Sequence, residues 1–206
     1  MYLFLPALRR PLRLSSAARC APILGGDYVN DDTGGIATNY EYKVLGEKKI
    51  LALWHPTSAP GVLFNPDSIQ IKSSLPGWPK PTLGEWELRD VYVLDILPLP
   101  VMGPRYCYGH RVAYIDQETW RLIPGEDYDA DGKLWKIYEN TSMEIPDDTG
   151  DGNYVQTYSE TLLNMRETHA TGSILNSPIR VGHQVPPEYR DASVAAFPSS
   201  LHGIMK

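Results

Sequence analysis

The sequence predicts a mainly β protein of the α+β class, built on one strongly bent antiparallel sheet with few short helices. Seventeen Gly and 18 Pro among 206 residues interrupt the chain too often for long helices. Polar and apolar residues also alternate, with the period of two that a strand requires, in one segment after another. Thirteen Tyr and five Trp, against three Phe, supply aromatic side chains with a polar tip, which suit half-exposed sheet surfaces.

The first half of the chain predicts short strands separated by loops. Strands are expected at residues 2–5 and 11–15, next to Pro6 and Pro11. Residues 20–37 are rich in glycine and aspartate, which indicates a loop with one turn of helix. Further strands are expected at 39–44 and 49–54, ahead of a proline-rich stretch at 56–84.

The second half has the clearest alternation. Strands are expected at 86–96, 106–114, 120–123 and 134–138, the last after the hairpin signal Asp129-Ala130-Asp131-Gly132. Two last strands are expected at residues 154–158 and 165–171, followed by a tail, 186–206, that is mostly extended.

Large apolar side chains fall on one predicted face of the two strongest strands. We expect them to line a greasy concave face that binds a hydrophobic ligand, although the same residues would also suit a filled core. The predicted ligand-binding residues are Trp86, Leu88, Tyr92, Leu94, Tyr106, Tyr108, Val112 and Tyr114.

Length and charge limit the class of protein. A chain of 206 residues predicts a single domain, 1–206. A net charge of −6 and a pI near 5.3 argue against nucleic-acid binding, which needs concentrated Lys and Arg. The basic segment Arg9–Arg19 is interpreted as a solvated strand face, or as a contact for an anionic partner. No segment has the ~20 apolar residues of a membrane span, and the apolar start precedes its arginines, the reverse of a secretory signal.

The potentially reactive residues form no catalytic or metal-binding pattern. Asp127-x-Asp129-x-Asp131-Gly132 copies half of a calcium loop, but Tyr138 stands where the bidentate carboxylate is needed, so a plain hairpin turn is expected. The five histidines are scattered, and no GxSxG or GxGxxG motif occurs. Cys20 and Cys107 are two free thiols or one disulfide. The sequence therefore predicts no enzyme, no cofactor and no metal.

Two stretches carry a resemblance to a known family. The opening MYLFLPALRRPLRLSSAARCAPILGGDYVNDD resembles a segment of LolA/LolB-like outer-membrane lipoprotein-sorting proteins. The matching residues are Tyr2, Leu5, Pro6, Arg9, Arg10, Arg13, Ser15, Arg19, Gly25, Asp27, Tyr28 and Asp32.

The second stretch, from Arg89 to Tyr138, resembles a domain-of-unknown-function family of the same lipoprotein-carrier superfamily. The matching residues are Tyr108, Gly109, Arg111, Tyr114, Asp116, Glu118, Thr119, Trp120, Asp127, Tyr128, Asp129, Gly132, Leu134 and Trp135.

The resemblance implies an open half-barrel with a cavity that shields acyl chains in the periplasm. It also implies that the chain corresponds to the C-terminal part of a longer half-barrel domain. The function expected is a non-catalytic carrier or chaperone for a lipid, a lipoprotein acyl chain or another hydrophobic ligand at the bacterial cell envelope. The alternative is an interaction subunit of an outer-membrane assembly or export system, with no ligand of its own.

Overall fold

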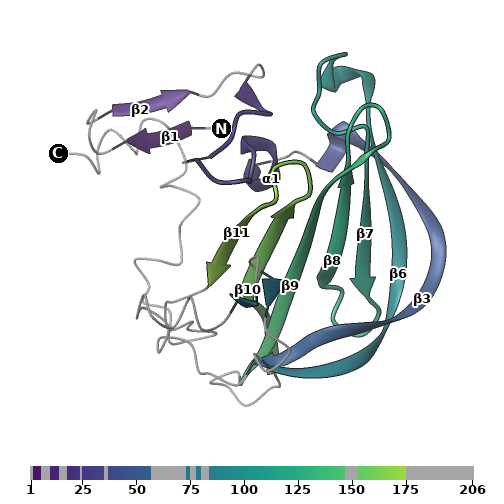
Figure 1. Ribbon diagram of the computed structural model, residues 1–206. Helices are drawn as coiled ribbons and strands as arrows, with labels where there is room; N and C mark the ends of the chain where they lie inside the picture. The colour runs from purple at the N-terminus through teal and green to yellow at the C-terminus, as the bar shows by residue number, and fades with distance from the viewer. Residues whose placement is uncertain are drawn as a thin grey trace, which may run out of the picture.

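The main element of the protein is one bent, seven-stranded sheet, seen in a computed structural model (Figure 1). The strand order is β11-β10-β9-β3-β6-β7-β8, and β8 also pairs with β9. The structure describes residues 2–5, 10–13, 18–23, 25–34, 37–56, 73–74, 78–79, 84–146 and 153–174.

The strands of this sheet differ greatly in length. They are β3 (Tyr40–Pro56), β6 (Gly84–Pro98), β7 (His110–Asp116), β8 (Leu122–Tyr128), β9 (Leu134–Pro146), β10 (Asn153–Asn164) and β11 (His169–Ile174). Two small pairs stand apart from the sheet: β1 (Tyr2–Leu5) with β2 (Arg10–Arg13), and β4 (Ser73–Ser74) with β5 (Trp78–Pro79). The helical turns are α1 (Asn30–Gly34), η3 (Ala37–Asn39) and η4 (Pro100–Met102).

The long β3–β6 hairpin produces the bend of the sheet. Its strands have 17 and 15 residues, whereas β7 and β8 have seven each. Figure 1 shows β3 and β6 curving past the ends of β7 and β8 toward the lower end of β9. There Trp54 pairs with Ser142 in the parallel sense, so the sheet approaches closure at one residue pair without forming a closed barrel.

β3 is one continuous strand, although the sequence predicted two. An irregularity in the pairing with β6 falls between Val44 and Gly46, where Leu45 is the extra residue. A bulge of this kind bends a strand without ending it. It also changes which side chains share a face, because Val44 lies opposite Leu94 while Glu47 lies opposite Tyr92.

The pairing registers define two faces of the sheet. The first, called the α1 face here, carries Leu94 and its partner Ala113, and then Tyr138 and its partner Leu162. Gly125 lies opposite Tyr138, and a Cβ at this position would come 2.1 Å from the tyrosine ring. The absence of a side chain at residue 125 therefore lets the Tyr138 ring lie flat across β8.

The other face, called the reverse face here, holds the apolar core of the lower half. Trp54, Ala52, Val91 and Ile123 are all buried there, and Tyr114 packs against them. A buried ion pair adjoins this core, because Arg89 donates two hydrogen bonds to Asp116, of 2.8 and 2.9 Å. The guanidinium of Arg89 also stacks 4.5 Å from the Trp54 ring.

The predicted fold class is confirmed, while several boundaries are corrected. The sheet is antiparallel apart from the Trp54–Ser142 bridge, and the 129–132 signal is a hairpin turn between β8 and β9. β7 begins at His110 rather than at 106, because Gly103–Gly109 form a loop ahead of it. Residues 165–168 are a turn rather than the start of a strand. The predicted tail, 186–206, lies outside the described residues, and the single-domain organisation stays a prediction.

Glu139 should make the stability of the protein depend on pH. This side chain is 6% exposed, and burial raises its pKa to about 7, against the effect of a hydrogen bond from the Leu53 N–H. As the pH rises, the unfolded chain releases the Glu139 proton near its ordinary pKa of 4.5, whereas the folded state keeps this proton to a higher pH. The contribution of Glu139 to the free energy of unfolding is fully present below pH 4.5. It is lost as the pH rises through the folded-state pKa of about 7, which lowers the free energy of unfolding by roughly 3 kcal/mol.

The measurement is urea unfolding of the wild type and of Glu139→Gln between about pH 5 and 8. The amide still accepts from Leu53 but does not titrate, so the variant should lose this part of the pH dependence. Glu41→Gln, at an exposed position of β3, is the control. Parallel pH profiles for the wild type and Glu139→Gln would contradict the prediction.

Candidate functional site

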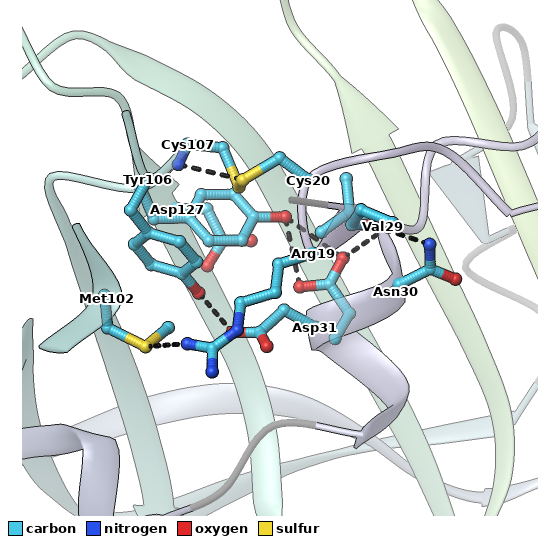
Figure 2. Close-up of a disulfide and its surroundings, with 12 residues drawn as sticks. Arg19, Cys20, Val29, Asn30, Asp31, Met102, Tyr106, Cys107 and Asp127 are labelled. Carbon is cyan, nitrogen blue, oxygen red and sulfur yellow. Dashed lines mark hydrogen bonds between the residues drawn. A yellow bond between two sulfur atoms is a disulfide. The ribbon is translucent and has the colours of Figure 1, made fainter. Parts of the chain in front are cut away.

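Residues 18–23 and 25–34 form a segment, called the cover segment here, that lies over the α1 face. The Cys20–Cys107 disulfide ties it to the loop before β7. Figure 2 shows this bond next to Tyr106, whose hydroxyl points at the Asp31 carboxylate. From the sheet, Lys136 donates to the carbonyl of Asp27 at 2.6 Å. The cover segment is thus held by one covalent bond and several charged contacts.

A buried network of charges joins the cover segment to the sheet. Arg111 of β7 donates to Asp127 of β8 at 2.7 Å and to Asp32 of α1 at 2.7 Å. The hydroxyl of Tyr108 donates to Asp32 and accepts from Lys136 at 2.8 Å. The guanidinium of Arg111 stacks 4.4 Å from the Tyr108 ring. Buried charges need this degree of pairing, since an unpaired one is costly.

Burial dominates the acid–base behaviour of this network. It raises the pKa of Asp127, whose side chain is fully buried, even though Arg111 opposes the shift. It lowers the pKa of Lys136, against the pull of Asp32 and Asp127. Burial also raises the pKa of Tyr108 far above its ordinary value, so the phenol remains a hydrogen-bond donor.

Asp31 lies beside this network and accepts hydrogen bonds from two tyrosines. The hydroxyls of Tyr40 and Tyr106 both reach its Oδ2, the latter at 2.6 Å. The two hydroxyls are 2.6 Å apart, which places three polar groups around one point. Burial, with Asp31 next in effect, raises the pKa of Tyr40 to about 12.

Asp27 anchors the other end of the cover segment to the last strands. Its carboxylate accepts from Thr171 at 2.7 Å and from Asn164 at 3.0 Å, and it lies 2.6 Å from Nδ1 of His169. Burial raises the pKa of Asp27, but these hydrogen bonds outweigh burial and leave the pKa below its ordinary value. The segment is therefore fixed to β7, β9, β10 and β11.

A cavity of about 390 Å³ remains between the cover segment and the α1 face. Its sheet wall is largely apolar, and its other end holds the acidic and aromatic residues of the cover segment. The apolar lining consists of Leu94, Ile96, Ala113, Ile115, Leu122 and Leu162, and the polar lining includes Asp31, Asp32, Arg111, Tyr138 and Glu160. We call this space the amphipathic pocket, and its size falls within the range of small-ligand sites.

A second cavity, of about 480 Å³, lies on the other side of the cover segment. Its lining includes the polar side chains of Asp27, Lys136, Asn164 and His169. Most of these groups already bond to each other or to the cover segment. The amphipathic pocket is therefore the better candidate for an apolar ligand.

The structure separates the eight predicted ligand-binding residues. Leu94 lines the amphipathic pocket. Trp86, Leu88 and Tyr92 share the α1 face with it but lie further down the strand, outside the pocket. Leu88 is 60% exposed, and Tyr92 stacks on Trp120.

The other four residues belong elsewhere. Tyr106 and Tyr108 precede β7 and pack against the cover segment. Val112 and Tyr114 lie opposite Asp95 and Val93, which places them on the reverse face. The assumption that all eight share one face is wrong, because alternation gives the period of a strand but not its register against the next one.

Sequence reasoning also missed the polar half of the pocket. Asp32 and Arg111 appeared only as matches to a family pattern, and Asp127 only there and in the predicted hairpin turn. The available signal was a cation and a carboxylate at strand positions, Arg111 and Asp127, whose faces are otherwise apolar. Charges at such positions need partners, which predicts a network even when the partners are unknown.

The remaining motif predictions have clear outcomes. Cys20 and Cys107 form a disulfide, which decides the alternative left open above. Asp129 accepts hydrogen bonds from the N–H groups of Asp131 and Lys133, as a structural turn residue does. In the described ranges, no group of three His, Cys, Asp or Glu side chains is placed to hold a metal ion. Within the same residues, no helix combines the length and apolar character needed to cross a membrane.

Comparison with known proteins identifies the family. The model of the family described as "Protein of unknown function (DUF1329)" matches residues 1–194. A curated relative, the uncharacterized protein PA3922 of Pseudomonas aeruginosa, is 29% identical over 112 residues. These residues are 53% of this chain and 23% of the relative, so the chain spans about a quarter of that protein's length.

Two solved structures share the fold, and a third superposes less well. A proposed outer membrane lipoprotein-sorting protein domain from Vibrio parahaemolyticus superposes with a TM-score of 0.57 at 19% identity, covering 94% of this chain and 64% of its own. A DUF1329 family protein from Desulfovibrio piger gives 0.57 and 19%, with 93% and 62% covered. The LolA superfamily protein NE2245 from Nitrosomonas europaea gives 0.45 and 16%, with 91% and 64% covered. The family match confirms the resemblance to a domain-of-unknown-function family, and the two structures with TM-scores of 0.57 confirm the fold.

Replacing Arg111 should destabilise the protein strongly. In Arg111→Met the buried carboxylate of Asp127 loses its cation, which typically costs roughly 3–5 kcal/mol. Urea unfolding at neutral pH measures the loss. The double variant Arg111→Met/Asp127→Asn removes the stranded charge and should recover part of it. Equal stability of the wild type and Arg111→Met would refute the network's role.

The disulfide should stabilise the fold by restricting the unfolded chain. It joins residues 87 apart in sequence, and closing a loop of this size restricts the unfolded state by about 4 kcal/mol. Cys20→Ser/Cys107→Ser should lose most of that stability in urea unfolding. Reduced wild type is the matched control and should unfold with the double variant. A midpoint unchanged by either treatment would show that the charged contacts alone hold the cover segment.

Proposed function

The chain belongs to the DUF1329 family, and from that premise we propose that it acts as a non-catalytic carrier or chaperone at the bacterial cell envelope. Its ligand is the apolar part of a lipid, a lipoprotein acyl chain or another hydrophobic molecule. The observation that carries the proposal is the amphipathic pocket, in which one wall of a bent sheet is apolar while a tethered segment covers it.

The energetics of such a site need no catalytic group. Each buried methylene gains ~0.8 kcal/mol, so a dozen supply about 10 kcal/mol from apolar contact alone. The pocket wall also continues onto exposed apolar residues of β3. Tyr42 pairs with Ile96 and Val44 pairs with Leu94, and Val44 is 64% exposed. A chain longer than the pocket can therefore extend along the same face.

Two further observations support a location at the cell envelope. A disulfide persists in an oxidising compartment such as the periplasm, and Cys20–Cys107 is formed in this fold. The similar Vibrio parahaemolyticus domain is described as a proposed outer membrane lipoprotein-sorting protein. Periplasmic location and lipid transport are accordingly part of the proposal.

A second candidate is an interaction subunit of an outer-membrane assembly or export system. The observation in its favour is the outer edge of β3, because its upper part pairs with β6 on one side. Val44, Leu45 and Leu51 are exposed along this strand. An exposed strand edge with apolar side chains is a template for an added strand. This function predicts capture of an envelope protein and no uptake of a hydrophobic probe.

The carrier function is tested with the uncharged fluorescent probe N-phenylnaphthylamine. We expect saturable binding to the wild type and about a tenfold weaker affinity for Leu94→Gln, because a Leu side chain contributes roughly 1.5–3 kcal/mol when buried. Leu88→Gln is the matched control, with the same substitution on the same strand outside the pocket. Absence of probe binding to the wild type, or equal losses in both variants, would sink the proposal.

A further inference from the structure

We infer that the amphipathic pocket selects amphiphiles with a cationic or hydrogen-bond-donating head group and rejects anionic ones. This inference rests on the proposed carrier function and names the ligand class for the same site. It follows from the composition of the pocket's polar end, which offers acceptors but no available cation.

The carboxylates come from two directions. Asp31 and Asp32 enter the pocket lining from α1, and Glu160 enters from β10 on the opposite side. The apolar wall formed by Leu94, Ala113 and Leu162 belongs to the sheet, and Glu160 lies two residues from Leu162 on β10. An apolar tail on this wall would therefore place its head between acidic groups.

Among the described residues, Arg111 is the only cation in the pocket lining, and its charge is already paired. It pairs with Asp32 at 2.7 Å and with both oxygens of Asp127, at 2.7 and 3.1 Å. Lys136 lies 3.8 Å from Asp32 Oδ2, so Arg111 and Lys136 together offset Asp32 and Asp127. Lys136 also donates to the Asp27 carbonyl and to Tyr108, and it does not line the pocket. The negative charge that remains in the lining is that of Asp31 and Glu160, neither of which forms an ion pair within the described part of the chain.

Asp31 supplies the acceptor for the head group. Its side chain belongs to a residue that is only 8% exposed, yet it lines the pocket. Tyr40 and Tyr106 both donate to Oδ2, while no hydrogen bond within the described part of the chain reaches Oδ1. A fixed carboxylate with one oxygen unused favours a donor and opposes a second anion.

Selectivity arises from both effects. An ammonium head gains a charge-assisted hydrogen bond to Asp31 and lies close to Asp32 and Glu160. A carboxylate head is repelled by Asp31 and Glu160, neither of which is paired with a cation among the described residues. Rejection through like charge is an effective source of specificity, because the wrong ligand brings an unpaired charge into a poorly solvated site.

The test is competition against N-phenylnaphthylamine by three amphiphiles of equal chain length: dodecylamine, dodecanol and dodecanoic acid. At about pH 8 the amine is protonated and the acid is ionised, as their side-chain analogues are. All are used below their micelle-forming concentrations. We expect dodecylamine to compete at least tenfold better than dodecanoic acid, with dodecanol between them.

Two variants locate the effect. Asp31→Asn keeps the shape and an acceptor oxygen but removes the charge, so the preference for the amine should fall severalfold while competition by dodecanol is unchanged. Glu160→Gln, on the opposite wall, should reduce the preference in the same direction. Leu94→Gln should weaken all three amphiphiles alike.

The outcomes distinguish the head-group selectivity from the carrier function. If the probe binds and dodecanoic acid competes as well as dodecylamine, the head-group inference is overturned while the carrier function stands. An amine preference that survives both Asp31→Asn and Glu160→Gln also overturns it. If neither the probe nor any amphiphile binds, the proposed function fails.

Discussion

The structure depends most on the guanidinium of Arg111, which joins three parts of the chain that are distant in sequence. It projects from β7, pairs with Asp127 on β8 and reaches Asp32 in the cover segment. Without that cation, the fully buried Asp127 has no charge partner in its strand pair, and α1 loses its ion pair with β7. The ion network therefore both stabilises the sheet and positions the segment that creates the pocket.

The division of the sheet into two faces follows from ordinary strand geometry and one exceptional strand. β3 is long enough to bend beyond β7 and β8, and its bulge at Leu45 lets it follow that bend. The lower part consequently buries Trp54 and Val91 on the reverse face, while the upper part presents Val44 and Leu94 on the α1 face. One hairpin thus contributes to a closed core at one end and an open apolar wall at the other.

Much of this fold could be predicted from the sequence, because alternation and turn residues act locally. The strands around residues 86–96 and 134–138 and the Asp129–Gly132 turn are examples. The site could not be predicted to the same degree. Whether Tyr114 faces the same way as Leu94 depends on the register of β7 against β6, which no residue in either strand specifies alone.

The polar half of the site illustrates a second limit. Asp32 and Arg111 are 79 residues apart, and their contact exists because the cover segment folds back over the sheet. Composition indicates that a strand cation needs a partner, but only the three-dimensional fold shows which one it has. The disulfide follows the same logic, since the spacing of Cys20 and Cys107 left free thiols and a bond equally open.

The groups that hold the cover segment also determine the chemistry of the pocket. Asp32 accepts hydrogen bonds from Arg111 and Tyr108, and these bonds fix α1 in place. Asp31, the neighbouring residue of α1, lines the pocket and binds two tyrosines through Oδ2, while no hydrogen bond among the described residues reaches Oδ1. A cation bound there would offset the negative charge of Asp31 beside the cover segment. Ligand binding and attachment of the cover segment should therefore strengthen each other, because both reduce the same electrostatic cost.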